Sequence, residues 1–145
     1  MNALTKILST QNSFAPVILR VPVGLTLAAH GAQKLFGWFG GYGLEGTGQW
    51  MASIGLEPGL LMAALSGSAE FFGGLFLVLG LLTRPTAVVV AFTMLVAIFS
   101  VHIHNGLFMS NNGYEYALAL FAVAVSLVMS GGGRVSVDAL ISNKH

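Results

Sequence analysis

The chain contains no cysteine, few charged residues and no strong excess of either charge. The lack of cysteine excludes disulfide bonds, thiol–disulfide chemistry and iron–sulfur ligation by this chain itself. Only 8% of the residues are charged, against about 25% in a typical soluble domain. The formal net charge of +1 provides no basic field, so we expect no nucleic-acid partner.

Apolar residues make up most of what remains. The 145 residues are 55% hydrophobic, and their mean hydropathy is +0.82. A water-soluble domain of this length cannot hide so much apolar surface. The sequence therefore predicts a single integral membrane domain, 1–145, in contact with membrane lipid.

Four apolar runs are long enough to cross a bilayer as helices, the last one marginally, because a spanning helix needs roughly 17–25 residues. Strands are a poor alternative, since the runs lack the period-two alternation of a membrane barrel. Short links favour antiparallel neighbours, so we predict an all-α, antiparallel four-helix transmembrane bundle. Arg20 and the lack of a convincing cleavage site favour an uncleaved first span over a signal peptide. The predicted spans are 16–36, 59–82, 85–104 and 114–130, with an outer loop at 37–58 and a tail at 131–145.

The basic residues predict the orientation, because cytoplasmic loops of membrane proteins are enriched in lysine and arginine. With both termini in the cytoplasm, only Lys34 lies at the outer side. The outer loop is rich in aromatic residues that fit a membrane interface, and Thr47 to Leu56 is predicted to form a short helix lying on the bundle. The residues predicted at the cytoplasmic side are Lys6, Arg20, Arg84, Arg134 and Lys144.

Ionisable residues inside a span cost about 2.5–3.5 kcal/mol each at mid-membrane, so each one needs a physical reason. The predicted topology places several of them in the outer half of the bundle, on all four helices, where they can form an outward-facing polar pocket. His102 and His104 are about 200° apart around a helix, so they cannot share a face, and the sequence leaves open which of them faces the bundle. The candidate ligand-binding residues are His30, Lys34, Glu70, His102 and Glu115. Within this pocket we expect His30 of the first span to meet Glu70 of the second.

Small residues accompany these candidates. Gly24 and Gly31 share a face of the first span with His30, and Gly67 and Gly74 lie near the face of Glu70 in the second. Such faces let two helix backbones approach closely. On the fourth span a stripe of small residues is predicted to continue from Glu115, through Ala119, Ala122 and Ser126.

Each candidate also has a structural interpretation. Lys34, His104 and Glu115 can lie at the water interface, Glu70 can form a buried ion pair that fixes helix packing, and His30 can make a structural hydrogen bond. The chemical alternatives are a quinone-like ligand held by Lys34, His30 and His102, or bis-histidine haem through His30 and His102. A metal is a further alternative, although no helix carries the Glu-x-x-His pair of di-metal bundles. The candidate metal ligands are His30, Glu70, His102 and Glu115.

Several motifs carry a resemblance to a known family. "AHGAQKLFGWFGG", "AEFFGGLFLVLGLLTRPTA", "VHIHNGLF", "NGYEYAL" and "GGGRVSVDAL" occur in this order between about Pro16 and Leu140. The chain resembles the DoxX family of bacterial membrane proteins. The resemblance implies a four-helix bundle in the bacterial inner membrane and an association with redox systems, including a thiosulfate:quinone oxidoreductase. It marks the five candidate residues as motif positions and implies no mechanism for them.

Two functional hypotheses follow. In the first, the chain is the membrane partner of a redox system, an oxidoreductase-associated subunit without a complete catalytic site, and its pocket binds a quinone or another small ligand. In the second, it is a non-enzymatic assembly module, as a monomer or a homo-oligomer, in which the polar cluster fixes helix packing. A permease is less favoured, because four spans without internal repeats would need oligomerisation to enclose a path.

Overall fold

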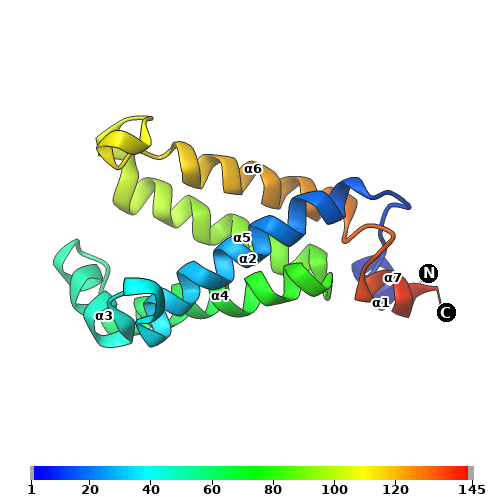
Figure 1. Ribbon diagram of the computed structural model, residues 1–145, viewed down its shortest axis with the longest axis horizontal. Coiled ribbons are helices and arrows are strands. Elements are labelled where there is room, and N and C mark those ends of the chain that lie inside the picture. The colour runs from blue at the N-terminus through cyan, green and yellow to red at the C-terminus, as the bar shows by residue number, and fades with distance from the viewer. Residues whose placement is uncertain (1, 144–145) are drawn as a thin grey trace.

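The computed structural model describes residues 2–143, and these residues form helices and connecting turns without a β-strand. Four long helices run between the two ends of the molecule (Figure 1). The predicted all-α class is confirmed. The long helices are α2 (Ala15–Phe36), α4 (Gly59–Leu79), α5 (Thr83–Ala97) and α6 (Glu115–Ser130), and the short ones are α1 (Ala3–Ile7), α3 (Gly43–Ser53) and α7 (Val137–Ser142).

Three of the described helices are long and apolar enough to cross a membrane. They are α2, α4 and the continuous helical segment Thr83–Asn105, in which α5 continues through a π-helical turn, Ile98–His102, and a 3-10 turn, Ile103–Asn105. The fourth, α6, has 16 residues, just under the roughly 17 that a span requires. The long helices lie close to the four predicted runs, and their path through a bilayer stays a prediction.

The most extensive contact between two described helices joins α2 to α4, and glycines make their close approach possible. A Cβ added to Gly24 would lie 2.6 Å from the carbonyl oxygen of Gly74. One added to Gly74 would lie 2.5 Å from both the Ala28 nitrogen and the Gly24 oxygen. Gly31 meets Gly67 and Phe71 in the same way, which confirms the predicted small-residue contact.

The second helix pair, α5 and α6, packs through ordinary apolar side chains. Val90 and Met94 of α5 and Leu120, Ala124 and Leu127 of α6 belong to one buried cluster. Large apolar side chains cover the outside of the bundle, including Ile18 at 70% exposure and Phe92 at 67%. A surface of this kind is suited to lipid and is too apolar for water.

The outer-loop helix differs from its prediction. Helix α3 covers Gly43–Ser53, so it begins four residues before the predicted start at Thr47 and ends before Leu56. Its buried residues are Thr47, Gly48 and Met51, and a Cβ on Gly48 would lie 3.0 Å from Leu60 Cα of α4. Contact with α4, which the sequence alone does not reveal, positions this helix.

One end of the molecule, which we call the basic end, holds α1, α7 and the arginines Arg20, Arg84 and Arg134 (Figure 1). Arg20 is 2% exposed, and its guanidinium donates to the carbonyl oxygens of Leu77, Val78, Gly132 and Val135. Arg20 thus supplies hydrogen-bond donors to the carbonyl groups in the last turn of α4 and holds the tail against this turn. Lys144, predicted at this end, lies outside the described residues.

The tail is tied to α5 by a second buried charge. Asp138 of α7 is 1% exposed, and its carboxylate accepts from the backbone nitrogens of Leu82 at 2.7 Å and Thr83 at 2.8 Å. These nitrogens lie at the start of α5, where N–H groups lack helical partners and the helix dipole favours a negative charge. The tail, predicted only as an extension after the last span, is therefore part of the packed domain.

The glycine contact yields a paired prediction within α4. Gly74→Ala should lower the free energy of unfolding by about 1–3 kcal/mol, because the added methyl group meets the backbone of α2. Gly73→Ala is the control, since its Cβ would make an ordinary contact at 3.4 Å with Val90. Unfolding in mixed detergent and SDS micelles measures both. Equal effects at the two neighbours would contradict the proposed close approach.

Asp138 yields a second stability prediction. Asp138→Ala should cost about 1–3 kcal/mol, because it removes a helix cap and leaves two N–H groups without an acceptor. Asp138→Asn should cost less, since one acceptor oxygen remains. Leu140→Ala, at a residue 67% exposed on the same helix, should change stability by under about 0.5 kcal/mol. The same micelle unfolding experiment ranks the three variants, and a different order would refute the capping role.

Candidate functional site

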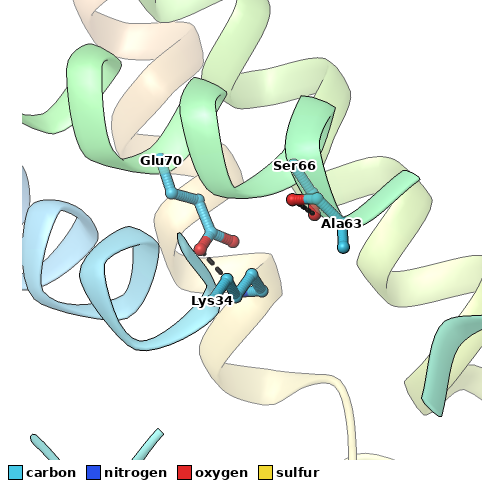
Figure 2. A network of polar contacts seen from close by, with 4 residues as sticks. All are labelled: Lys34, Ala63, Ser66 and Glu70. Atoms are coloured by element: carbon cyan, nitrogen blue, oxygen red, sulfur yellow. Dashed lines mark hydrogen bonds and ion pairs between the residues drawn. The ribbon is translucent and has the colours of Figure 1, made fainter. Parts of the chain in front are cut away.

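An ion pair between α2 and α4 forms the centre of the candidate site. The Nζ atom of Lys34 lies 2.5 Å from Oε2 of Glu70 (Figure 2), and the two side chains are 24% and 9% exposed. A carboxylate this buried needs a cation or a proton. Gly67, one turn before Glu70, leaves room for this contact, because a Cβ there would lie 3.2 Å from Lys34 Cβ.

The ion pair corrects two expectations. Lys34 is partly buried and paired, so it is not simply a surface residue at the water interface. The partner of Glu70 is Lys34 and not His30, since His30 makes no ion pair or hydrogen bond within residues 2–143. The sequence-based alternative of a buried ion pair at Glu70 describes the contact that is present.

His102 faces the bundle and His104 is exposed, which answers the question that the sequence left open. His102 ends the π-helical turn, a local distortion that is common at functional sites. Its Nδ1 atom lies 2.8 Å from the carbonyl oxygen of Asn112. A carbonyl oxygen only accepts, so Nδ1 carries the proton, and Nε2 of the neutral ring is an acceptor. Nε2 makes no hydrogen bond to any residue that the structure describes.

An aromatic residue that is not among the five sequence-based candidates also lies beside these polar groups. Tyr116 of α6 lies beside His30, with 6.0 Å between the ring centroids and an angle of 46° between the ring planes. Its position in the helix was a usable signal: Tyr116 precedes the buried Leu120 by four residues and therefore shares its face. The Tyr116 hydroxyl is a donor and an acceptor near the other polar groups.

Glu115 does not join this cluster. Its Oε1 accepts a hydrogen bond of 2.9 Å from the backbone nitrogen of Met109, and the carboxylate thus anchors the preceding loop. The small-residue stripe predicted from Glu115 is wrong as a packing face, because Ala119 and Ala122 are exposed. The buried residues of α6 include Ala117, Leu120, Ala124 and Leu127.

Two adjoining cavities open around the ion pair, and Lys34, Glu70 and His102 line both of them. The first has a volume of about 250 Å³ and lies between all four long helices, with His30 and Tyr116 on its wall. The second, of about 220 Å³, extends toward α3 and is lined by Trp50, Met51 and Leu56. Four of the five candidate residues therefore meet at one cavity, and Glu115 does not line it.

The cavity combines mostly apolar walls with a few polar groups, the usual composition of a small-molecule site. Leu27, Met94 and Leu120 supply apolar surface in the first cavity. Within residues 2–143 no three histidine, aspartate or glutamate side chains are grouped closely enough to hold a metal ion. The geometry thus gives no support to a metal on His30, Glu70, His102 and Glu115.

Breaking the ion pair from one side tests its burial. Lys34→Met should lower the free energy of unfolding by about 2–3 kcal/mol, less than the 3–5 kcal/mol of a fully buried pair because Lys34 is partly exposed. Lys34→Met with Glu70→Leu should recover most of this loss, since no unpaired charge remains. The single variant Glu70→Leu completes the comparison. If the loss of unfolding free energy in the double variant equals the sum of the losses in the two single variants, direct coupling is excluded.

Comparison with known proteins identifies the family. The DoxX family model matches residues 15–103, from α2 to the 3-10 turn after His102, and this range contains His30, Lys34 and Glu70. A Bacillus subtilis protein named "Putative oxidoreductase CatD" is 32% identical over 125 residues, covering 86% of this chain and 85% of its own. The Escherichia coli inner membrane protein YqjF is 33% identical over 114 residues, covering 74% and 82%. No solved structure matches the chain. These matches establish that the chain belongs to the DoxX family of membrane proteins.

Proposed function

We propose that this chain is a bacterial inner-membrane protein that binds a quinone, or a ring ligand of similar size and polarity, as the membrane partner of a redox system. The observation that carries the proposal is the cavity in which Lys34, Glu70, His30, His102 and Tyr116 meet between four helices. The name "Putative oxidoreductase CatD" agrees with a redox role, and the name of the inner membrane protein YqjF agrees with this membrane.

The distribution of charge supports an outward-facing cavity. Of the described basic residues, Lys6, Arg20, Arg84 and Arg134 lie toward the basic end, whereas Lys34 lies at the opposite end. Because basic residues favour the cytoplasmic side, this distribution supports the proposal that the basic end and both termini face the cytoplasm. The cavity then lies in the outer half of the membrane.

The polar groups match the two oxygens of a quinone ring. A quinone carbonyl oxygen accepts hydrogen bonds, and the Lys34 ammonium, the His30 ring N–H or the Tyr116 hydroxyl can donate them. A hydroxyl of the reduced ligand can donate to Nε2 of His102. Leu27, Met94 and Leu120 provide apolar surface for the ring.

The size of the cavity limits what fits. A volume of about 250 Å³ lies below the roughly 300–1,000 Å³ of sites for drug-sized ligands, so a single ring fits better than a dinucleotide. The chain also lacks cysteine for thiol chemistry. Its residues would bind and orient the ligand, while a partner supplies or accepts the electrons.

The second hypothesis, an assembly module, is favoured by one observation. The Lys34–Glu70 pair joins α2 and α4, which share the most extensive contact between described helices, so it can fix their packing without any ligand. In that case loss of the ion pair would lower stability. The wild-type protein itself would show no measurable affinity for a quinone.

Binding of a short-chain ubiquinone or menaquinone analogue to the purified protein in lipid nanodiscs separates the two. We expect saturable binding that weakens about tenfold or more in His30→Ala and Glu70→Gln, because each removes a polar group from the cavity wall. His102→Ala should also weaken binding. The measurement is quenching of Trp50, which lines the second cavity, or calorimetric titration.

The control is Glu45→Gln, which removes one carboxylate from the exposed surface of α3 and should leave binding unchanged. Thermal unfolding of each variant shows that it is folded. No saturable binding by the wild type, or equal affinity in folded wild type and folded His30→Ala and Glu70→Gln, would refute the ligand site. A loss of stability in Glu70→Gln without quinone binding by the wild type would favour the assembly module.

A further inference from the structure

A second hollow lies at the basic end, far along the bundle from the Lys34–Glu70 pair. It has a volume of about 440 Å³ and lies between α2, the last turn of α4 and the tail. None of its lining residues belongs to the cavity of the proposed function. Its lining residues include Val17, Arg20, Leu79, Arg134, Val135 and Leu140.

The hollow is positively charged. Arg20 and Arg134 are among its lining residues, and no aspartate or glutamate is. Asp138 is the only described carboxylate of the tail, and both of its oxygens already accept from the backbone at the start of α5. An anion entering the hollow would therefore meet two guanidinium groups and no carboxylate in its wall.

The guanidinium group of Arg134 is held in place but keeps its donors. Its Cζ atom lies 4.1 Å from the centroid of the Phe14 ring, a cation–π contact, and its backbone nitrogen donates to Ser13. The guanidinium itself makes no hydrogen bond within residues 2–143. A planar fork oriented in this way is suited to the oxygens of a phosphate.

Arg20 lies at the base of the hollow. Its four hydrogen bonds to carbonyl oxygens use Nε–H, both N–H groups of Nη1 and one of Nη2, so one Nη2 N–H has no partner among the described residues. The nearest carboxylate, Asp138, interacts with Arg20 from beyond ion-pair distance, and its two oxygens are already bonded to backbone nitrogens. Both features favour an anion nearby.

Apart from Ser136, whose hydroxyl is already bonded to backbone groups of the tail, the remaining wall is aliphatic and continues onto the outer surface of the bundle. Val17 of α2 and Leu79 of α4 line the hollow, and Leu140 on α7 is 67% exposed. A charged group beside aliphatic surface at the end of a span matches a lipid headgroup with its acyl chain. Basic pockets of this kind between transmembrane helices bind anionic phospholipids.

We propose that this hollow is a binding site for the phosphate headgroup of an anionic phospholipid, with Arg134 as the main contact. The proposal concerns the basic end alone and is independent of the quinone hypothesis. A bound headgroup would join α2, α4 and the tail through one ligand, so binding should also raise the thermal stability of the protein.

The test measures binding of phosphatidylglycerol and of phosphatidylcholine to the full-length protein in neutral detergent, by native mass spectrometry and by the rise in melting temperature. The wild type should prefer phosphatidylglycerol. Arg134→Gln should weaken phosphatidylglycerol binding about fivefold and reduce the stabilisation by this lipid. Lys6→Gln is the matched control, since it removes one positive charge from exposed helix α1 outside the hollow and should behave as the wild type.

A second variant probes the hollow without touching an arginine. Leu140→Glu should also weaken phosphatidylglycerol binding, because the added carboxylate repels the phosphate from an exposed position that tolerates substitution. Equal affinity for both lipids in the wild type, or the same loss in Lys6→Gln as in Arg134→Gln, would overturn the proposal. Competition by inorganic phosphate at the same concentration as the lipid would overturn the assignment to a lipid.

Discussion

The close approach of α2 and α4 is the constraint on which the candidate site depends. The two helix backbones are in contact where Gly24 faces Gly74. The same interface extends along α4 to Gly67, where a Cβ would lie 3.2 Å from Cβ of Lys34, a member of the ion pair. A larger residue at Gly67 would first have to displace the Leu35 side chain, 2.8 Å from such a Cβ, and would also crowd the stem of Lys34. Since both charged residues line both cavities, the helix packing and the polar site form a single arrangement.

The long helices could be predicted because their length and composition are set by the bilayer and not by particular neighbours. The short elements could not. Helix α3 is positioned by the contact of Gly48 with Gly59 and Leu60 of α4, and α7 is held by Asp138 at the start of α5. Both positions depend on contacts between segments far apart in the sequence, which apolar patterning does not record.

The candidate site was predictable in its residue types but not in the direction in which each side chain points. His30, Lys34, Glu70 and His102 stand out because ionisable residues are rare in apolar spans. Their rotation about each helix was less accessible: a π-helical turn at Ile98–His102 changes the register in which His102 faces the bundle. Glu115 was selected for its charge, yet Tyr116 shares the face of buried Leu120, so helical phase was the better guide on α6.

The polar groups of the molecule differ in whether their hydrogen-bonding capacity is already used. Asp138 and most of Arg20 are satisfied by backbone groups, so their burial is explained by the fold. His102 Nε2 and the hydroxyl of Tyr116 make no hydrogen bond within residues 2–143, although both side chains line a cavity. Unused capacity in an enclosed space is what distinguishes a site for a ligand from a structural network. At the basic end the guanidinium of Arg134 is exposed, oriented by Phe14 and makes no hydrogen bond within residues 2–143, which makes it the group there most suited to an external partner.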